Sequence, residues 1–159
     1  PKFTFGWNIQ GEWNGFDVSL LFQGAAGANR MMYGEWVEGP AYEVFAGEHW
    51  RDRWTVDNQN GNAEMPRLEA ANNRNSSTYN SFFLKNCSYL RLKNAQIGYT
   101  FDKAMVAKLG IEKLRLYLSG SNLLTFSSLW QGLDPEGNSG RLSDFPTTKI
   151  INFGVNLVF

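Results

Sequence analysis

The sequence predicts an all-β fold, an antiparallel segment of a transmembrane β-barrel with long extracellular loops. Three observations indicate this fold class. Several stretches alternate between apolar and polar residues, which is the pattern of a strand with one apolar face. These stretches are about as long as a tilted strand that crosses a bilayer, roughly 9–11 residues. The connections between them alternate between short and long, as in bacterial barrels.

The first two strands are expected to form a hairpin. Residues 2–13 alternate, and their odd positions form an almost wholly apolar face. The dipeptide Asn14-Gly15 follows and indicates a type I′ turn, because both central residues of that turn need a positive φ. Residues 16–23 alternate again, with the even positions apolar and Leu21 as the exception on the polar side.

A long connection follows the hairpin. Residues 24–85 show no sustained period, and their Asn-rich stretches have the composition of loops. A connection of about sixty residues is far longer than the usual 2–6, so we expect it to be functional, disordered or built from small elements of its own.

The third and fourth strands are expected to flank a short helical turn. The third strand covers Tyr89–Phe101, and its apolar residues change parity between Lys93 and Asn94, which indicates a β-bulge. Asp102 is placed to cap a helical turn over residues 103–109, and Gly110 is placed to end it. The fourth strand runs from Leu114 towards Phe126.

A second loop and a closing strand complete the pattern. Residues 127–148 contain Asp134-Pro-Glu-Gly137, which predicts a type I turn. The closing strand covers residues 149–159. We expect its apolar face to contact membrane lipid through four residues: Phe153, Val155, Leu157 and Phe159. Five strands are fewer than the roughly eight that close a barrel, so we expect residues 1–159 to be a piece of a longer protein.

The composition argues against several other classes. The 15 Lys and Arg balance the 15 Asp and Glu, so the charge gives no indication of nucleic-acid binding. No apolar run reaches the roughly 18 residues of a membrane-spanning helix. One cysteine, Cys87, excludes an internal disulfide and a multi-cysteine metal site. We expect no cofactor, no metal and no enzymatic activity, since the single histidine, His49, lies in a loop beside aromatic and charged residues.

Aromatic residues in the loops are the candidate binding residues. Four tryptophans lie in the predicted extracellular loops: Trp36, Trp50, Trp54 and Trp130. Such rings stack on sugars or anchor a partner protein, because Trp and Tyr dominate interface hot spots. The alternative is that they pack the loops' own small cores.

Several motifs, in this order, resemble the carboxy-terminal end of the SusC/RagA family of TonB-linked outer-membrane proteins. They are Phe5-Gly-Trp-Asn, Tyr89-Leu-Arg-Leu-Lys-Asn, Ile97-Gly-Tyr-Thr, Gly120-Ser-Asn-Leu-Leu-Thr, Asp134-Pro-Glu and Phe153-Gly-Val-Asn-Leu-Val-Phe. The resemblance spans nearly the whole chain, although the long loop matches only in character.

The resemblance implies that residues 1–159 form the last strands of a large barrel plugged by an amino-terminal domain. It implies an outer-membrane transporter that imports glycans, oligosaccharides or peptides. It also implies a SusD-like surface lipoprotein as partner and a TonB complex that supplies energy through the plug. Neither the plug nor a TonB-contacting segment lies in this sequence.

Two other functions compete with this interpretation. A soluble carbohydrate-binding β-sandwich would have similar strands, but its apolar faces would pack together in a dry core. A glycan-active enzyme would need His49 in a catalytic arrangement. The direction that the apolar faces take therefore separates the barrel from the sandwich.

Overall fold

The computed structural model describes residues 1–34, 37, 47–68, 79–130, 132–137 and 147–159. They divide into two compact units. The sheet unit comprises residues 1–26, 89–127 and 147–159, and the loop unit comprises residues 27–88 and 128–146.

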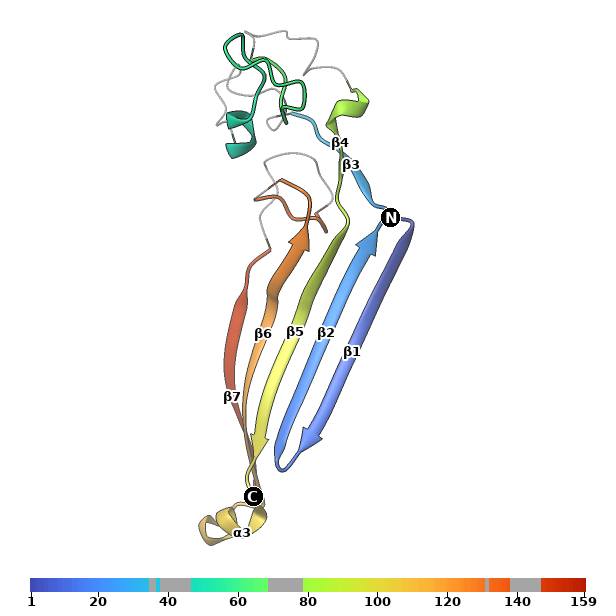
Figure 1. The fold of residues 1–159 in the computed structure, drawn as a ribbon. Helices are drawn as coiled ribbons and strands as arrows, with labels where there is room; N and C mark the ends of the chain where they lie inside the picture. The colour runs from blue at the N-terminus through green and yellow to red at the C-terminus, as the bar shows by residue number, and fades with distance from the viewer. Residues whose placement is uncertain (35–36, 38–46, 69–78, 131, 138–146) are drawn as a thin grey trace. The chain divides into compact units, whose positions relative to one another are not determined.

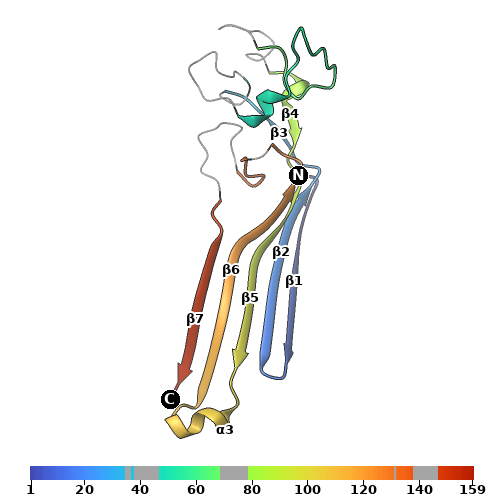
Figure 2. The same cartoon turned by 60° about the vertical axis from the view of Figure 1, so that its left-hand side comes forward.

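The sheet unit is one five-stranded antiparallel sheet in the order β1-β2-β5-β6-β7 (Figures 1 and 2). Its strands are β1 (Phe3–Trp13), β2 (Phe16–Ala26), β5 (Tyr89–Thr100), β6 (Lys113–Ser127) and β7 (Ile150–Val158). Every predicted strand is present with nearly its expected bounds, although β2 extends three residues beyond the alternating stretch. Each strand pairs with the strand of this sheet that follows it in the chain, so the order needs no crossover.

The short connections form as the local sequence predicts. Asn14 has φ 48° and Gly15 has φ 83°, so both residues take the positive φ that a type I′ turn needs. The connection between β5 and β6 contains α3 (Lys103–Val106) and the 3₁₀ turn η4 (Ala107–Leu109). The Asp102 side chain accepts a hydrogen bond from the Ala104 amide at 3.0 Å, and Gly110 ends the turn at φ 71°. No helix that the structure describes is long and apolar enough to cross a membrane.

The predicted bulge lies where the sequence changes parity. On β5, Leu92 and Asn94 pair with neighbours on both sides, and Lys93 is left out of the register. On β6, the partner of Leu92 is Leu124 and the partner of Asn94 is Ser121, so two residues are bypassed. One of them, Asn122, has φ 55°. The bulge restores the apolar residues of β5 to one face on both sides of the irregularity.

The register gives the sheet one apolar face and one mainly polar face. Phe16 of β2 pairs with Trp13 of β1 and with Tyr99 of β5. Every second row of the register likewise places apolar residues or glycines side by side. The apolar face consists of these residues: Phe3, Phe5, Trp7, Ile9, Gly11, Trp13, Phe16, Val18, Leu20, Phe22, Gly24, Ala26, Leu90, Leu92, Ala95, Ile97, Tyr99, Leu114, Leu116, Leu118, Gly120, Leu124, Phe126, Ile151, Phe153, Val155 and Leu157. No charged or amide side chain interrupts it.

The apolar face is exposed, as the barrel interpretation predicts. The relative exposure is 60% for Trp7 and 69% for Phe153, and no second sheet covers these residues in the described part of the sheet unit. A β-sandwich would bury such residues between two sheets. The sandwich alternative is therefore wrong for this sheet.

The loop unit is built from small elements around its own core, which is one of the alternatives expected for the long connection. It contains the paired strands β3 (Asn29–Met31) and β4 (Leu84–Asn86) and the 3₁₀ helices η2 (Glu48–Arg51) and η3 (Ser81–Phe83). Its buried core contains Ala28, Met32, Val37, Trp50, Met65, Phe83, Cys87, Leu129 and Trp130. The core residues come from both loops, although the strands β5 and β6 separate these loops in the sequence.

We predict that residues 1–159 alone are not a stable monomer in water, because the sheet has two unpaired edges and one exposed apolar face. The chain should aggregate without detergent and become monodisperse only in micelles or lipid. Size-exclusion chromatography with light scattering in the two conditions measures this. A monomer that unfolds cooperatively in plain buffer would contradict the prediction.

Candidate functional site

The predicted membrane-facing residues lie on the apolar face or directly after it. In β7, Phe153, Val155 and Leu157 pair with Leu118, Leu116 and Leu114. Their relative exposures are 69%, 47% and 47%, and Phe159, which follows the strand, is 80% exposed. That they contact lipid stays a prediction, which their exposure on a continuous apolar face supports.

Aromatic rings gather towards both ends of the apolar face. At the hairpin end, Phe16 and Tyr99 have ring centroids 4.7 Å apart, with Trp13 in the same row. At the other end, Phe5 and Trp7 have centroids 5.8 Å apart. Outer-membrane barrels carry aromatic girdles at the two membrane interfaces, with aliphatic residues between them.

The polar face carries a charged pair that spans three strands. Arg115 of β6 donates from Nε to Asp17 Oδ1 of β2 at 2.9 Å and from Nη2 to Oδ2 at 2.5 Å. Strand β5 lies between β2 and β6, so the arginine side chain crosses β5 to reach its partner. A bidentate ion pair of this kind fixes the relative orientation of the two side chains better than a single hydrogen bond does.

Two glycines make room for these side chains. Asp17, Gly98, Tyr117 and Gly154 lie in one row across four strands. A Cβ atom on Gly98 would lie 2.6 Å from Arg115 Nη2 and 2.6 Å from Asp17 Oδ1, and a Cβ on Gly154 would overlap the Tyr117 ring. The guanidinium carbon of Arg115 lies 5.0 Å from the Tyr117 ring centroid. Gly98 thus leaves room for the Arg115–Asp17 pair, and Gly154 leaves room for the Tyr117 ring.

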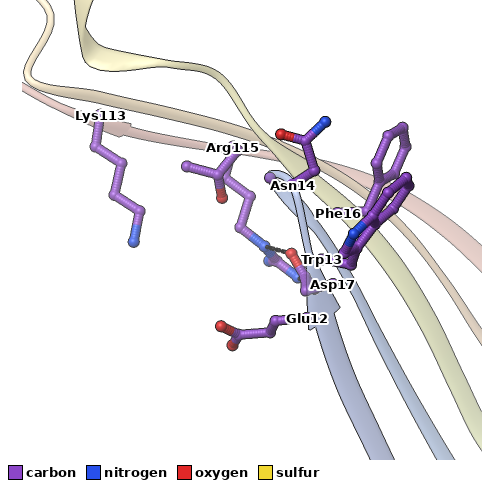
Figure 3. Close-up of a pocket in the computed structure, with 9 residues that line it drawn as sticks. Glu12, Trp13, Asn14, Phe16, Asp17, Lys113 and Arg115 are labelled. Carbon is purple, nitrogen blue, oxygen red and sulfur yellow. Dashed lines mark hydrogen bonds and ion pairs between the residues drawn. The ribbon is translucent and has the colours of Figure 1, made fainter.

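A recess of about 600 Å³ lies at this end of the sheet, beside the β1–β2 hairpin. Figure 3 shows Glu12, Asp17, Lys113 and Arg115 on one side of the strands, with the rings of Trp13 and Phe16 turned away from them. Asp17 and Arg115 are paired with each other, whereas the ends of Glu12 and Lys113 extend into the open space. The recess therefore presents balanced charge on the face that lines the interior in barrels of this kind.

The tryptophans that were predicted to bind a ligand or partner differ in how far they are buried in the loop unit. Trp50 and Trp130 are 4% and 8% exposed and belong to the core of the unit. Trp54 is partly buried, and Trp36 lies outside the described residues. The burial of Trp50 and Trp130 fits the packing alternative, because both rings belong to the core of the loop unit.

A second recess, of about 400 Å³, lies on the loop unit. One part of its lining comes from the first loop, with Glu48, His49, Arg51, Asp52 and Glu64, and the other comes from Ser128, Leu129 and Trp130 of the second loop. The His49 ring stacks on the Trp130 ring, with centroids 4.2 Å apart and planes at 11°.

Lys85 borders the same aromatic group. Its Nζ lies 5.0 Å from the Trp130 ring centroid and 4.8 Å from that of Phe82. Burial lowers the pKa of Lys85, and the negative charge of Glu64 opposes this shift. The ammonium lies within the distance at which two aromatic rings attract a cation.

His49 takes part in the packing around the loop recess. His49 lies flat against Trp130, so one face of its ring is occupied by packing. Among the described residues, no three His, Cys, Asp or Glu side chains are grouped so that they could hold a metal ion.

Sequence reasoning missed the Asp17–Arg115 pair and the shared construction of the loop recess. The alternation placed both charged residues on polar faces, but it did not give the register that aligns them. Gly98 was the available signal, since a glycine inside a strand often marks a close approach. No comparable signal indicated that the two loops pack together.

Known proteins similar to this chain include TonB-dependent receptors. The chain is 30% identical over 174 residues to TonB-dependent receptor P3 of Formosa agariphila, and 27% identical over 174 residues to TonB-dependent receptor P26 of the same organism. Each alignment covers 100% of this chain, but only 16% and 17% of the two receptors. The chain thus spans about a sixth of the length of these relatives. No protein-family model matches it.

Solved structures give the same result for the fold. The chain superposes on the RagAB peptide importer in an open-open state with a TM-score of 0.75 and 24% identity, over 98% of this chain and 17% of that one. It superposes on the RagAB peptide transporter with a TM-score of 0.74 and 25% identity, over 96% and 16%. These similarities confirm the predicted barrel segment, the resemblance to SusC/RagA proteins and the outer-membrane location.

We predict that Gly98→Ala destabilises the barrel, because the new Cβ would separate Arg115 from Asp17 and leave two charges without their partners. The free energy of unfolding should fall by about 1–3 kcal/mol. Urea titration of the full-length protein in lipid measures the change, with unfolding followed by the loss of the heat-modifiable band on a gel. Gly11→Ala is the matched control, because a Cβ there meets no atom within 4 Å. Equal midpoints for the two variants would show that the close approach at Gly98 carries no stability.

Proposed function

We propose that residues 1–159 are the carboxy-terminal part of the barrel domain of an outer-membrane active transporter. In this proposal, the transporter imports peptides, oligosaccharides or other glycans, works with a SusD-like surface lipoprotein and receives energy from a TonB complex. The missing amino-terminal part would carry the plug and the TonB contact. The chain would act by binding and guiding a substrate, without catalysis.

The observation that carries this proposal is the sheet with one apolar and one polar face. The apolar face suits lipid on the outside, and the polar face suits a watery interior. The similarity to TonB-dependent receptors and to the RagAB peptide importer supports transport as the activity. A peptide is the substrate class of that importer, which makes peptides the first class to test here.

The loop unit also offers a surface for the lipoprotein partner. Tyr79 and Phe82 are 72% and 46% exposed, and Leu84 is 45% exposed, all within one short segment of the first loop. The Tyr79 ring lies 6.2 Å from that of Tyr33. Exposed aromatic side chains are the usual anchors of protein interfaces, so this segment is better placed for the partner than the buried Trp50 or Trp130.

The proposed transport is tested in cells whose growth depends on imported peptides or oligosaccharides. Deletion of the full-length gene should abolish uptake of one substrate class, and the wild-type gene should restore it. Abolition of TonB should give the same loss, since the import is expected to need energy. Uptake that continues at the wild-type rate in both deletions would contradict the proposal.

Tyr79→Ala with Phe82→Ala should reduce the amount of lipoprotein that co-purifies with the receptor by about tenfold or more, because two interface anchors are lost. The amount of inserted barrel should not change. Trp54→Ala is the comparison variant at a partly buried ring, and Val56→Ala at a 65% exposed aliphatic residue controls for loss of surface area. Undiminished co-purification with the double variant would assign the partner contact to another surface.

A further inference from the structure

Arg30 connects the two loops of the loop unit. Arg30 lies in β3, at the start of the first loop, and its side chain is partly buried. Its guanidinium donates to three backbone carbonyls of the second loop: to Asp134 O at 3.0 Å, to Pro135 O at 2.8 Å and to Gly137 O. These hydrogen bonds join residues that are more than a hundred positions apart in the sequence.

The carbonyls that Arg30 contacts belong to a turn with its own hydrogen bonds. The Gly137 amide donates to Asp134 O at 3.0 Å, and the Glu136 amide donates to Asp134 Oδ1 at 2.8 Å. The Leu133 amide donates to Trp130 O at 3.2 Å, which links this turn to the residues that line the recess. The planar fork of an arginine suits several acceptors at once, whereas a lysine ammonium acts as a single point.

The second loop also contacts the first loop through Ser128, Leu129 and Trp130. Leu129 and Trp130 complete a core that otherwise comes from the first loop. The same residues, with Ser128, line one part of the 400 Å³ recess, and residues of the first loop line the other part. Trp130 also provides the ring on which His49 stacks.

We propose that the described parts of the two loops, residues 27–34, 37, 47–68, 79–88, 128–130 and 132–137, form one binding element, and that Arg30 is the positioning residue that holds its second half. Loss of Arg30 releases the turn at Asp134–Gly137, moves Trp130 away from His49 and opens the recess, while the first loop keeps its own fold. The binding role rests on the proposed function, but the positioning role is measured without transport.

Cys87 provides a reporter for this release, because it is 5% exposed and belongs to the same core as Leu129 and Trp130. The test uses the full-length receptor in cells, with any cysteine outside this segment replaced by serine and with a membrane-impermeant maleimide as the probe. In Arg30→Ala, Cys87 should react about ten- to a hundredfold faster than in the wild type, because charged hydrogen bonds no longer oppose local opening. Arg30→Lys should react several times faster than the wild type, because one ammonium cannot replace the fork.

Two controls separate positioning from general unfolding. Arg53→Ala should leave the rate unchanged, because Arg53 donates to Trp50 O within the first loop at 3.2 Å. Ala63→Cys, in a Cys87→Ser background, reports on a buried residue of the first loop and should stay protected when Arg30 is replaced. Labelling of this second reporter would show that Arg30 holds the whole unit, and would overturn the positioning role.

A wild-type labelling rate of Cys87 in Arg30→Ala would overturn the proposal directly. If that variant does not insert, Asp134→Ala replaces it, because it loosens the same turn from the second loop by removing the acceptor of the Glu136 amide. It should also increase labelling several times, and an unchanged rate would again overturn the proposal. Labelling that increases while uptake stays normal would support the positioning role and contradict the proposed use of the loops in transport.

Discussion

The antiparallel register is the constraint on which the rest of the sheet depends. Because side chains alternate with a period of two, one register sets the direction of every side chain in a strand. Four successive registers in this chain agree, so the apolar residues of five strands share a face. A slip of one residue in any strand would place amides and charges among the rings and aliphatic side chains. In a lipid environment, where backbone groups pair only within the sheet, that error would be costly.

The bulge and the glycines are adjustments that this constraint requires. Without the bulge, the apolar residues of β5 that precede Lys93 would lie on the opposite face of the sheet from the apolar residues that follow Asn94. Gly98 and Gly154 have a different role, since their lack of a side chain allows Arg115 and Tyr117 to lie against the polar face of the sheet. The polar face thus holds large side chains and still leaves the space beside the hairpin open.

Local chemistry explains which features the sequence predicts well. The hairpin at Asn14-Gly15, the cap at Asp102 and the parity change near Lys93 each depend on a few adjacent residues, and the structure confirms all three. The burial of Trp50 and Trp130 depends on contacts between loops that the pattern of neither loop encodes. The same is true of Arg30, whose acceptors lie more than a hundred residues away, and of Asp17 and Arg115, which are separated by 98 positions. Such long-range pairs depend on how distant segments align in the folded structure. The local residue pattern of a single sequence does not predict that alignment.

The shared core of the two loops has a consequence for how such a receptor changes over evolutionary time. Surface loops are normally free to change in length and composition, one independently of another. Here a change in residues 27–88 that moves Arg30 or Trp50 alters the environment of Leu129 and Trp130 as well. The two loops are therefore expected to change together. A chimera that contains only one of them would bring together core residues that do not pack against each other. An exchange of this surface between related proteins would accordingly need both segments to be transferred together.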